Sequence, residues 1–106
     1  MKVYTRGQNA KFRFSFYNSL KVLTDPSGIV ITLKDDQEAE ITSFDDIGYL
    51  DQYATGVYDL YFQIPKTWDT GQYEIEVDGT VEGQNTSNSQ LFKVRDAAPS
   101  VAEDDD

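Results

Sequence analysis

The sequence contains no cysteine and no histidine. These absences exclude disulfides, thiolate and imidazole metal ligands, cysteine nucleophiles and every histidine-based catalytic triad. Basic residues are few as well, because 9 Lys and Arg stand against 19 Asp and Glu, which gives a net charge of −10. Nucleic acids and anionic membrane surfaces are polyanions, so we expect neither as the main partner.

Long hydrophobic runs are also missing. The longest apolar run, 29–31, is far too short to span a bilayer. The first residues, Met1–Arg6, lack the apolar segment of a secretory signal. We therefore expect a complete small gene product that is made in the cytoplasm.

What the chain does have is enough apolar material for one core. Of its 106 residues 39% are hydrophobic and 13% aromatic, which fits one domain and hardly two. Residues 97–106 are small and then acidic, without a core-forming pattern. We predict one β-sandwich domain over residues 1–96 and an acidic C-terminal tail over 97–106.

Side-chain polarity alternates with a period of two along most of the chain. In Lys11–Phe16 the three Phe residues share one face, and Gly56–Ile64 and Tyr73–Asp78 repeat the pattern. This is the pattern of strands with one dry and one wet face. We predict an all-β sandwich of seven or eight strands, and we expect the carboxylates on the wet faces to be fully solvated with ordinary pKa values.

Turn residues separate these strands. Asp25–Gly28 and Asp35-Asp36 are predicted turns, and Asp78-Gly79 together with Glu82–Asn85 is predicted to mark the loop before the last strand. The stretch Ser43–Tyr53 is ambiguous, because it fits either one capped helical turn or a strand. We favour a strand or an irregular crossover there.

One short motif has a physical mechanism. The run Asp69-Thr70-Gly71-Gln72-Tyr73 leads directly into a predicted strand. It resembles the D-x-[AG]-x-Y run that opens a strand of immunoglobulin-like domains, where the Tyr hydroxyl caps backbone at a corner of the sandwich. The resemblance implies that Asp69, Gly71 and Tyr73 form a structural corner, and that Ile75 occupies the site of the family's second cysteine. The family's buried Trp has no equivalent here, because the only Trp is Trp68.

A wider pattern adds a narrower resemblance. It runs from the strand at Gly7–Phe14 through Asp25–Leu33, Tyr53–Pro65 and Thr70–Val77 to a closing Phe92–Val94. It resembles small immunoglobulin-like proteins of tailed-phage particles, and also modules of bacterial surface proteins and macroglobulins. This implies a non-enzymatic structural or interaction module, such as a capsid decoration or tail-associated protein on a virion, where it could form a homo-oligomer.

Charge is distributed unevenly along the chain. Residues 1–24 hold five basic residues and no acid, whereas residues 25–106 hold all 19 acids. The basic residues can balance acidic neighbours locally, or they can orient the molecule on a partner. In the second case Lys2, Arg6, Lys11 and Arg13 are the predicted docking residues, with capsid or tail proteins as partners.

The sequence contains few signals for catalysis, sugar binding or metal binding. Neither a catalytic site nor a cofactor is predicted, because the remaining carboxylates lack a deep, desolvated setting in so small a sandwich. The alternative to a virion role is a carbohydrate- or cell-surface-binding module, with Tyr61 and Trp68 as stacking rings. The acidic clusters 35–38 and 45–51 contain several carboxylates but lack calcium-loop spacing, so we predict no metal site.

Overall fold

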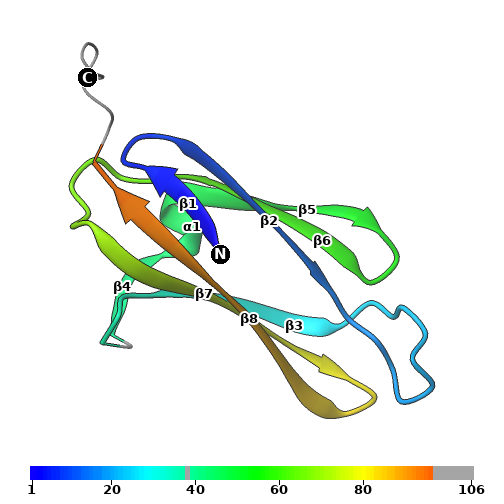
Figure 1. Cartoon of the computed structure of the whole chain (residues 1–106). Helices are drawn as coiled ribbons and strands as arrows, with labels where there is room; N and C mark the ends of the chain where they lie inside the picture. Colours follow the sequence, from blue (N-terminus) through cyan, green and yellow to red (C-terminus); the bar gives the residue numbers. More distant parts are fainter. Residues whose placement is uncertain (38, 97–106) are drawn as a thin grey trace.

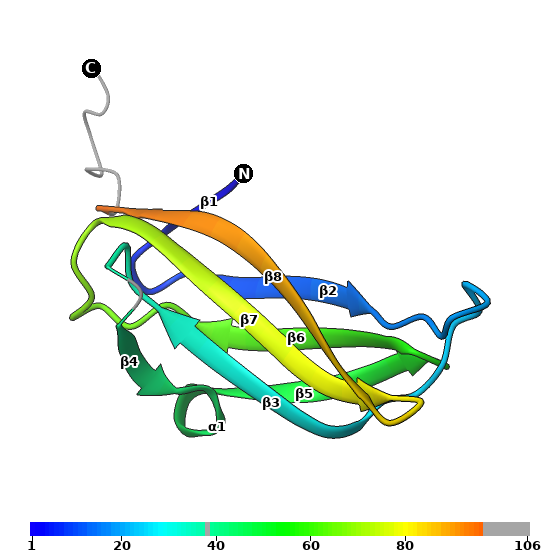
Figure 2. The same cartoon turned by 90° about the horizontal axis from the view of Figure 1, so that it is seen from below.

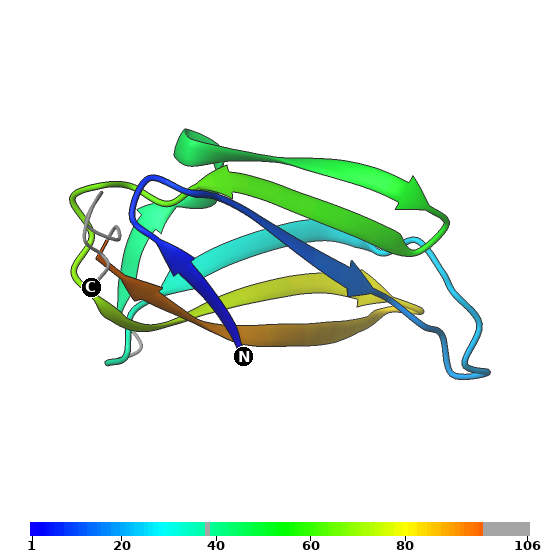
Figure 3. The ribbon, with the colours of Figure 1, turned by 45° about the horizontal axis from the view of Figure 1, so that its top comes forward.

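The computed structural model describes residues 1–37 and 39–96. The predicted tail therefore lies outside the described residues, as does Glu38 of the first acidic cluster. The described chain forms two β-sheets packed face to face, and one helical turn lies at their edge (Figures 1 and 3).

The larger sheet has five strands in the order β1-β8-β7-β3-β4. Their bounds are β1 Lys2–Thr5, β3 Ser27–Lys34, β4 Glu40–Ser43, β7 Gly71–Val81 and β8 Gln84–Arg95. The smaller sheet has the order β2-β6-β5, with β2 Asn9–Ser15, β5 Gly48–Ala54 and β6 Val57–Gln63. The predicted two-sheet sandwich is confirmed. Its strand pairs are antiparallel except for β1 and β8, which run parallel.

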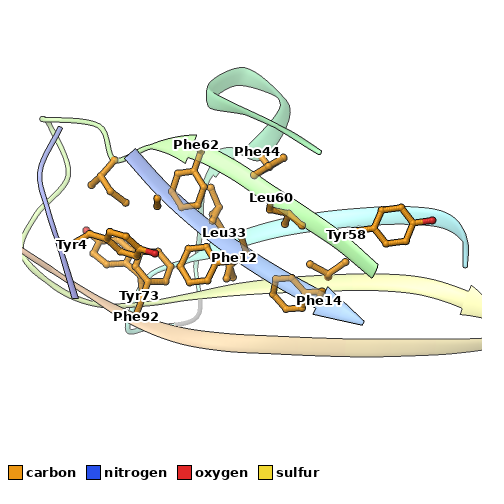
Figure 4. Packing of buried hydrophobic residues seen from close by; sticks show 14 of the residues in the cluster. Tyr4, Phe12, Phe14, Leu33, Phe44, Tyr58, Leu60, Phe62, Tyr73 and Phe92 are labelled. Carbon is orange, nitrogen blue, oxygen red and sulfur yellow. The ribbon is translucent and has the colours of Figure 1, made fainter. Parts of the chain in front are cut away.

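The core lies between the two sheets and is largely aromatic (Figure 4). The alternation places Phe12 and Phe14 of β2 inside, opposite Phe92 of β8. Phe12 contacts Phe62 at 6.0 Å and Phe92 at 5.1 Å between ring centroids. Because no sulfur links the sheets, contacts of this kind hold them together.

Two turn predictions change in detail. The chain does not turn at Asp78-Gly79, because β7 continues to Val81 and the reversal occurs at Glu82-Gly83, where both residues have positive φ. Gly79 has another role, since a Cβ there would lie 2.8 Å from Pro26 Cβ. The glycine lets the loop pack closely on the strand.

The ambiguous stretch contains both alternatives. A single helical turn, α1 Phe44–Ile47, precedes the predicted strand β5. Phe44 is 2% exposed and packs edge-on against Phe62 at 6.0 Å, so the turn closes one end of the core. No helix among the described residues has the length and hydrophobicity needed to cross a bilayer.

Candidate docking surface

The residues of the predicted corner lie at the start of β7. The Tyr73 hydroxyl donates a hydrogen bond of 2.6 Å to the backbone oxygen of Asp69. Gly71 lies between them with φ of 144°, a conformation that favours glycine. Burial raises the pKa of Tyr73, and the nearby Asp69 carboxylate adds to this effect. The hydrogen bond ties Tyr73 to the backbone of Asp69 across Gly71, which is the geometry that a structural corner requires.

Trp68 belongs to the same corner. Its ring stacks on Tyr73 at 4.8 Å and also contacts Phe62 at 6.3 Å, so one side of the ring faces the core. The structure therefore does not bring Trp68 and Tyr61 together as one stacking platform. An open hollow of about 250 Å³ lies beside Trp68, with Asp35, Asp36 and Asp69 in its lining. No group of three or more potential metal-ligating side chains gathers among the described residues.

The most distinctive surface is the outer face of the smaller sheet. Here the register places Tyr61 between Lys11 and Tyr49, and Asp59 between Arg13 and Asp51. We call this surface the tyrosine–arginine face, and it consists of Lys11, Arg13, Tyr49, Tyr53, Asp59 and Tyr61.

Asp59 lies at the centre of this face and is only 3% exposed. Its Oδ1 accepts a bond of 2.8 Å from Arg13 Nε, and its Oδ2 accepts one of 3.1 Å from Arg13 Nη2. Lys11 Nζ lies 3.8 Å from the same carboxylate. The hydrogen bonds from Arg13 hold the pKa of Asp59 below its usual range, against the opposing effect of burial. The expectation that wet-face carboxylates are fully solvated is wrong at Asp59.

Arg13 is held from both sides. Its guanidinium binds Asp59 by two parallel bonds and lies 3.8 Å from the centroid of the Tyr53 ring. A bidentate pair and a cation–π contact together restrict the side chain to one orientation. The hydrogen bond to Asp59 also raises the pKa of Arg13.

Two further tyrosines continue the face toward the start of β2. Tyr49 and Tyr61 stack at 5.1 Å with an interplanar angle of 21°, and Lys11 Nζ lies 5.7 Å from the Tyr61 centroid. Tyr61 is half-buried by this contact, whereas Tyr49 and Tyr53 are 63% and 64% exposed. The freely presented rings are thus Tyr49 and Tyr53. An open hollow of about 350 Å³ adjoins the stacked pair, with Asn9 and Gln63 in its lining.

The four predicted docking residues separate into two groups. Lys11 and Arg13 lie on the tyrosine–arginine face, and Lys2 Nζ reaches the edge of β2, where it donates a 2.6 Å bond to the Lys11 backbone oxygen. Arg6 instead pairs with Asp96 beyond the end of β8, at 2.5 Å. Charge alone pointed to Lys11 and Arg13, and Tyr61 was predicted as a stacking ring, but only the strand register shows that tyrosines and these cations share one face.

Comparison with solved structures supports the fold. Titin domain M7 is 16% identical, with a TM-score of 0.50 over 89% of this chain and 84% of that chain. The ZIG-8–RIG-5 IG1–IG1 heterodimer gives 13% identity and a TM-score of 0.50, and the match covers 90% of this chain and 81% of that chain. The structure of Dpr11 IG1 bound to DIP-gamma IG+IG2 has 12% sequence identity and a TM-score of 0.50, and the match covers 89% of this chain and 96% of that chain. No family model matches the chain, and no curated protein does. The chain is an immunoglobulin-like β-sandwich without a disulfide.

Proposed function

We propose that this domain is a non-enzymatic interaction module that docks on a protein partner through the tyrosine–arginine face. The observation that carries this proposal is a pair of exposed rings on one face: Tyr53 lies against an Arg13 that Asp59 fixes, and Tyr49 stacks on Tyr61. Tyrosine and arginine are enriched at the energetic centres of protein interfaces, where a rigid ring gives a large contact area at little entropic cost. A side chain that is already held in place loses little further freedom on binding.

The charges on this face support recognition of a protein. The two positive charges of Lys11 and Arg13 are offset by Asp59 and by Asp51, which the register places directly across from Asp59, so the face offers no strong field for a polyanion. Two of the similar solved structures are complexes between immunoglobulin-like domains, which is consistent with a docking role for this fold.

The finer proposal concerns the partner. The resemblance of the sequence to immunoglobulin-like proteins of tailed-phage particles makes a capsid or tail surface the first partner to test. On such a repeating surface many copies of a weakly binding domain add up to stable attachment. A capsid decoration role is the form of this proposal with the clearest physical readout, because bound copies would raise the resistance of the capsid to heat.

Cosedimentation tests both the proposed docking face and the proposed virion partner. The purified protein would be mixed with capsids and tails isolated from the source that produces it, and the double variant Tyr49→Ala, Tyr53→Ala would be compared with Tyr17→Ala, which removes a 53% exposed tyrosine from another surface. We expect binding by the wild type and by Tyr17→Ala, and its loss in the double variant. Equal binding by all three would contradict docking through this face. Absence of binding to any particle fraction would contradict the virion role.

A carbohydrate partner is the second candidate, and the hollow beside the stacked tyrosines favours it. Tyr49 presents a free ring face, while Asn9 and Gln63 place side-chain amides at the rim. Sugars are bound by such combinations of a flat apolar surface and amide hydrogen bonds. A glycan array would show a ligand that is lost in Tyr49→Ala and kept in Tyr17→Ala, whereas an array without any ligand would contradict this candidate.

A further inference from the structure

One strand edge of the larger sheet is only partly covered. β8 extends from Gln84 to Arg95, but β1 pairs with it only from Phe92 onward. Figures 1 and 2 show β1 beside the C-terminal half of β8 and the N-terminal half of β8 running past it to the hairpin tip. Among residues 1–37 and 39–96 no strand pairs with residues 84–91 on this side.

The backbone groups on this open edge can be identified from the hydrogen bonds. Arg6 N donates to Arg95 O at 3.1 Å, so Arg95 faces the β1 side. The register between β8 and β7 is unbroken from Val94 to Gln84, so alternate residues of β8 face the same side as Arg95. Asn85, Ser87 and Ser89 therefore direct their N–H and C=O groups outward from the sheet.

Other edges in the described part of the chain are protected. On the edge of β2, Lys11 N donates to the Tyr4 hydroxyl and Lys11 O accepts from it, and Arg13 O accepts from Gln90 Nε2 at 2.9 Å. The edge strand β4 is only four residues long, and the edge strand β5 contains Asp51. Side-chain caps, short edge strands and charges are the usual means by which proteins prevent edge pairing.

The open part of β8 has none of these devices. Residues 84–91 read Gln-Asn-Thr-Ser-Asn-Ser-Gln-Leu, without a charge and without a proline. This is unusual in a chain of net charge −10, where most surfaces of two copies would repel each other. A second copy of this chain can approach here without bringing like charges of the two edges together.

We infer that the open edge of β8 pairs antiparallel with the same edge of a second copy, which joins the two larger sheets into one. Such a contact is isologous, so each copy supplies the same donors and acceptors. Pairing that is centred on Ser87 places Asn85 opposite Ser89 of the second copy, and every outward group of these residues gains a partner. This contact is separate from the tyrosine–arginine face, so its failure would leave the proposed function standing.

The same register explains a group of exposed apolar side chains. Pairing centred on Ser87 places the β7–β8 hairpin tip of one copy next to Leu91 and the start of β1 in the other copy. The loop that contains Leu20 and Val22 is tied to this tip, because Ser19 N donates to Glu82 Oε1 at 2.9 Å. Exposed apolar residues thus lie at both ends of the contact: Leu20 78% and Val22 56% on one side, and Met1 70%, Val3 46% and Leu91 47% on the other. Their burial would favour the pair.

Sedimentation velocity over a wide range of protein concentration tests the inference. We expect a shift from a 12.0 kDa species to one of twice that mass as concentration rises. Ser89→Pro removes an outward N–H while leaving the β7 ladder intact, and should weaken dimerisation about tenfold or more. The matched control Ser89→Ala keeps the N–H and should dimerise like the wild type. A monomer at every concentration, or equal dimerisation of the proline variant, would overturn the inference.

A cysteine cross-link gives an answer even if the proline variant does not fold. Because the chain has no native cysteine, Ser87→Cys introduces a single thiol. In the inferred register the two Cα atoms are about 5.5 Å apart, within the range of a disulfide. Under air oxidation we expect rapid covalent dimers from Ser87→Cys and slow ones from Ser27→Cys, an exposed serine on β3. Equal rates for the two variants would overturn the inference.

Hydrogen exchange distinguishes a second copy from another occupant of the edge. If a second copy covers it, the amides of Asn85, Ser87 and Ser89 are protected at high protein concentration and exchange freely on dilution. Protection that does not depend on concentration would mean that another segment of the same chain covers the edge, which would overturn the inference.

Discussion

Replacing Tyr73 with Phe tests the corner that joins the two halves of the sandwich. The substitution removes one hydroxyl whose hydrogen bond to Asp69 O measures 2.6 Å. The phenyl ring keeps its stacking on Trp68 at 4.8 Å and on Phe92 at 5.8 Å. The variant therefore isolates the hydrogen bond from the packing of the ring.

The expected loss follows from the setting of the bond. A neutral hydrogen bond contributes about 0.5–1.5 kcal/mol net to stability, and more is lost when the remaining partner stays buried and unpaired. Asp69 is exposed, so water can replace the hydroxyl at its backbone oxygen. We therefore expect Tyr73→Phe to lower the free energy of unfolding by about 1 kcal/mol, which is a decrease of about 5 °C in the melting temperature of a domain of this size.

The protein contains its own probe for this experiment. Trp68 is the only tryptophan and its ring lies on Tyr73, so its fluorescence reports unfolding at the corner itself. Urea unfolding followed by this signal would be compared with Tyr49→Phe, which removes a hydroxyl from a 63% exposed ring. Unchanged stability of Tyr73→Phe, or an equal decrease in Tyr49→Phe, would refute the structural role of the corner.

Three further predictions concern the core, the smaller sheet and pH. Phe12→Ala removes a ring with no exposed surface and should cost about 3–5 kcal/mol in urea unfolding. Gly48→Ala places a Cβ against the backbone oxygen of Tyr61 and 2.7 Å from Phe62 Cβ, and should cost about 3 kcal/mol by calorimetry, whereas the exposed Ser89→Ala should be neutral. The pKa of Asp59 is lowered in the folded state, so its carboxylate stabilises the fold above the ordinary carboxyl pKa of about 4 and this contribution is lost as pH falls through the folded-state value. The free energy of unfolding should therefore fall less steeply with decreasing pH in Asp59→Asn than in the wild type. Identical pH profiles of the two proteins would contradict the ion pair.

The strands were predictable because each has one buried face. The alternation in 11–16 and 56–64 identified the inward residues directly, and every Phe of the first run is buried. The corner was predictable for another reason, since its hydrogen bond joins residues only four positions apart. Local patterns of this kind are present in the sequence before any register is known.

What the sequence could not show depends on pairing between distant segments. Asp59 has the spacing of a solvent-facing residue, and its burial results from Arg13, which lies 46 positions away. The parallel pairing of β1 with β8, and the open edge that remains below it, likewise require the register. The one-turn helix α1 is too short for a period to appear, and Phe44 holds it through a tertiary contact with Phe62.

Hydrogen exchange of the domain, alone and bound to a partner found by cosedimentation, tests most directly whether the tyrosine–arginine face is the docking surface. If it is, amides of β5 and β6 become protected on binding and those at the centre of β7 keep their exchange rates. Protection confined to the larger sheet, with β5 and β6 unchanged, would contradict the proposal.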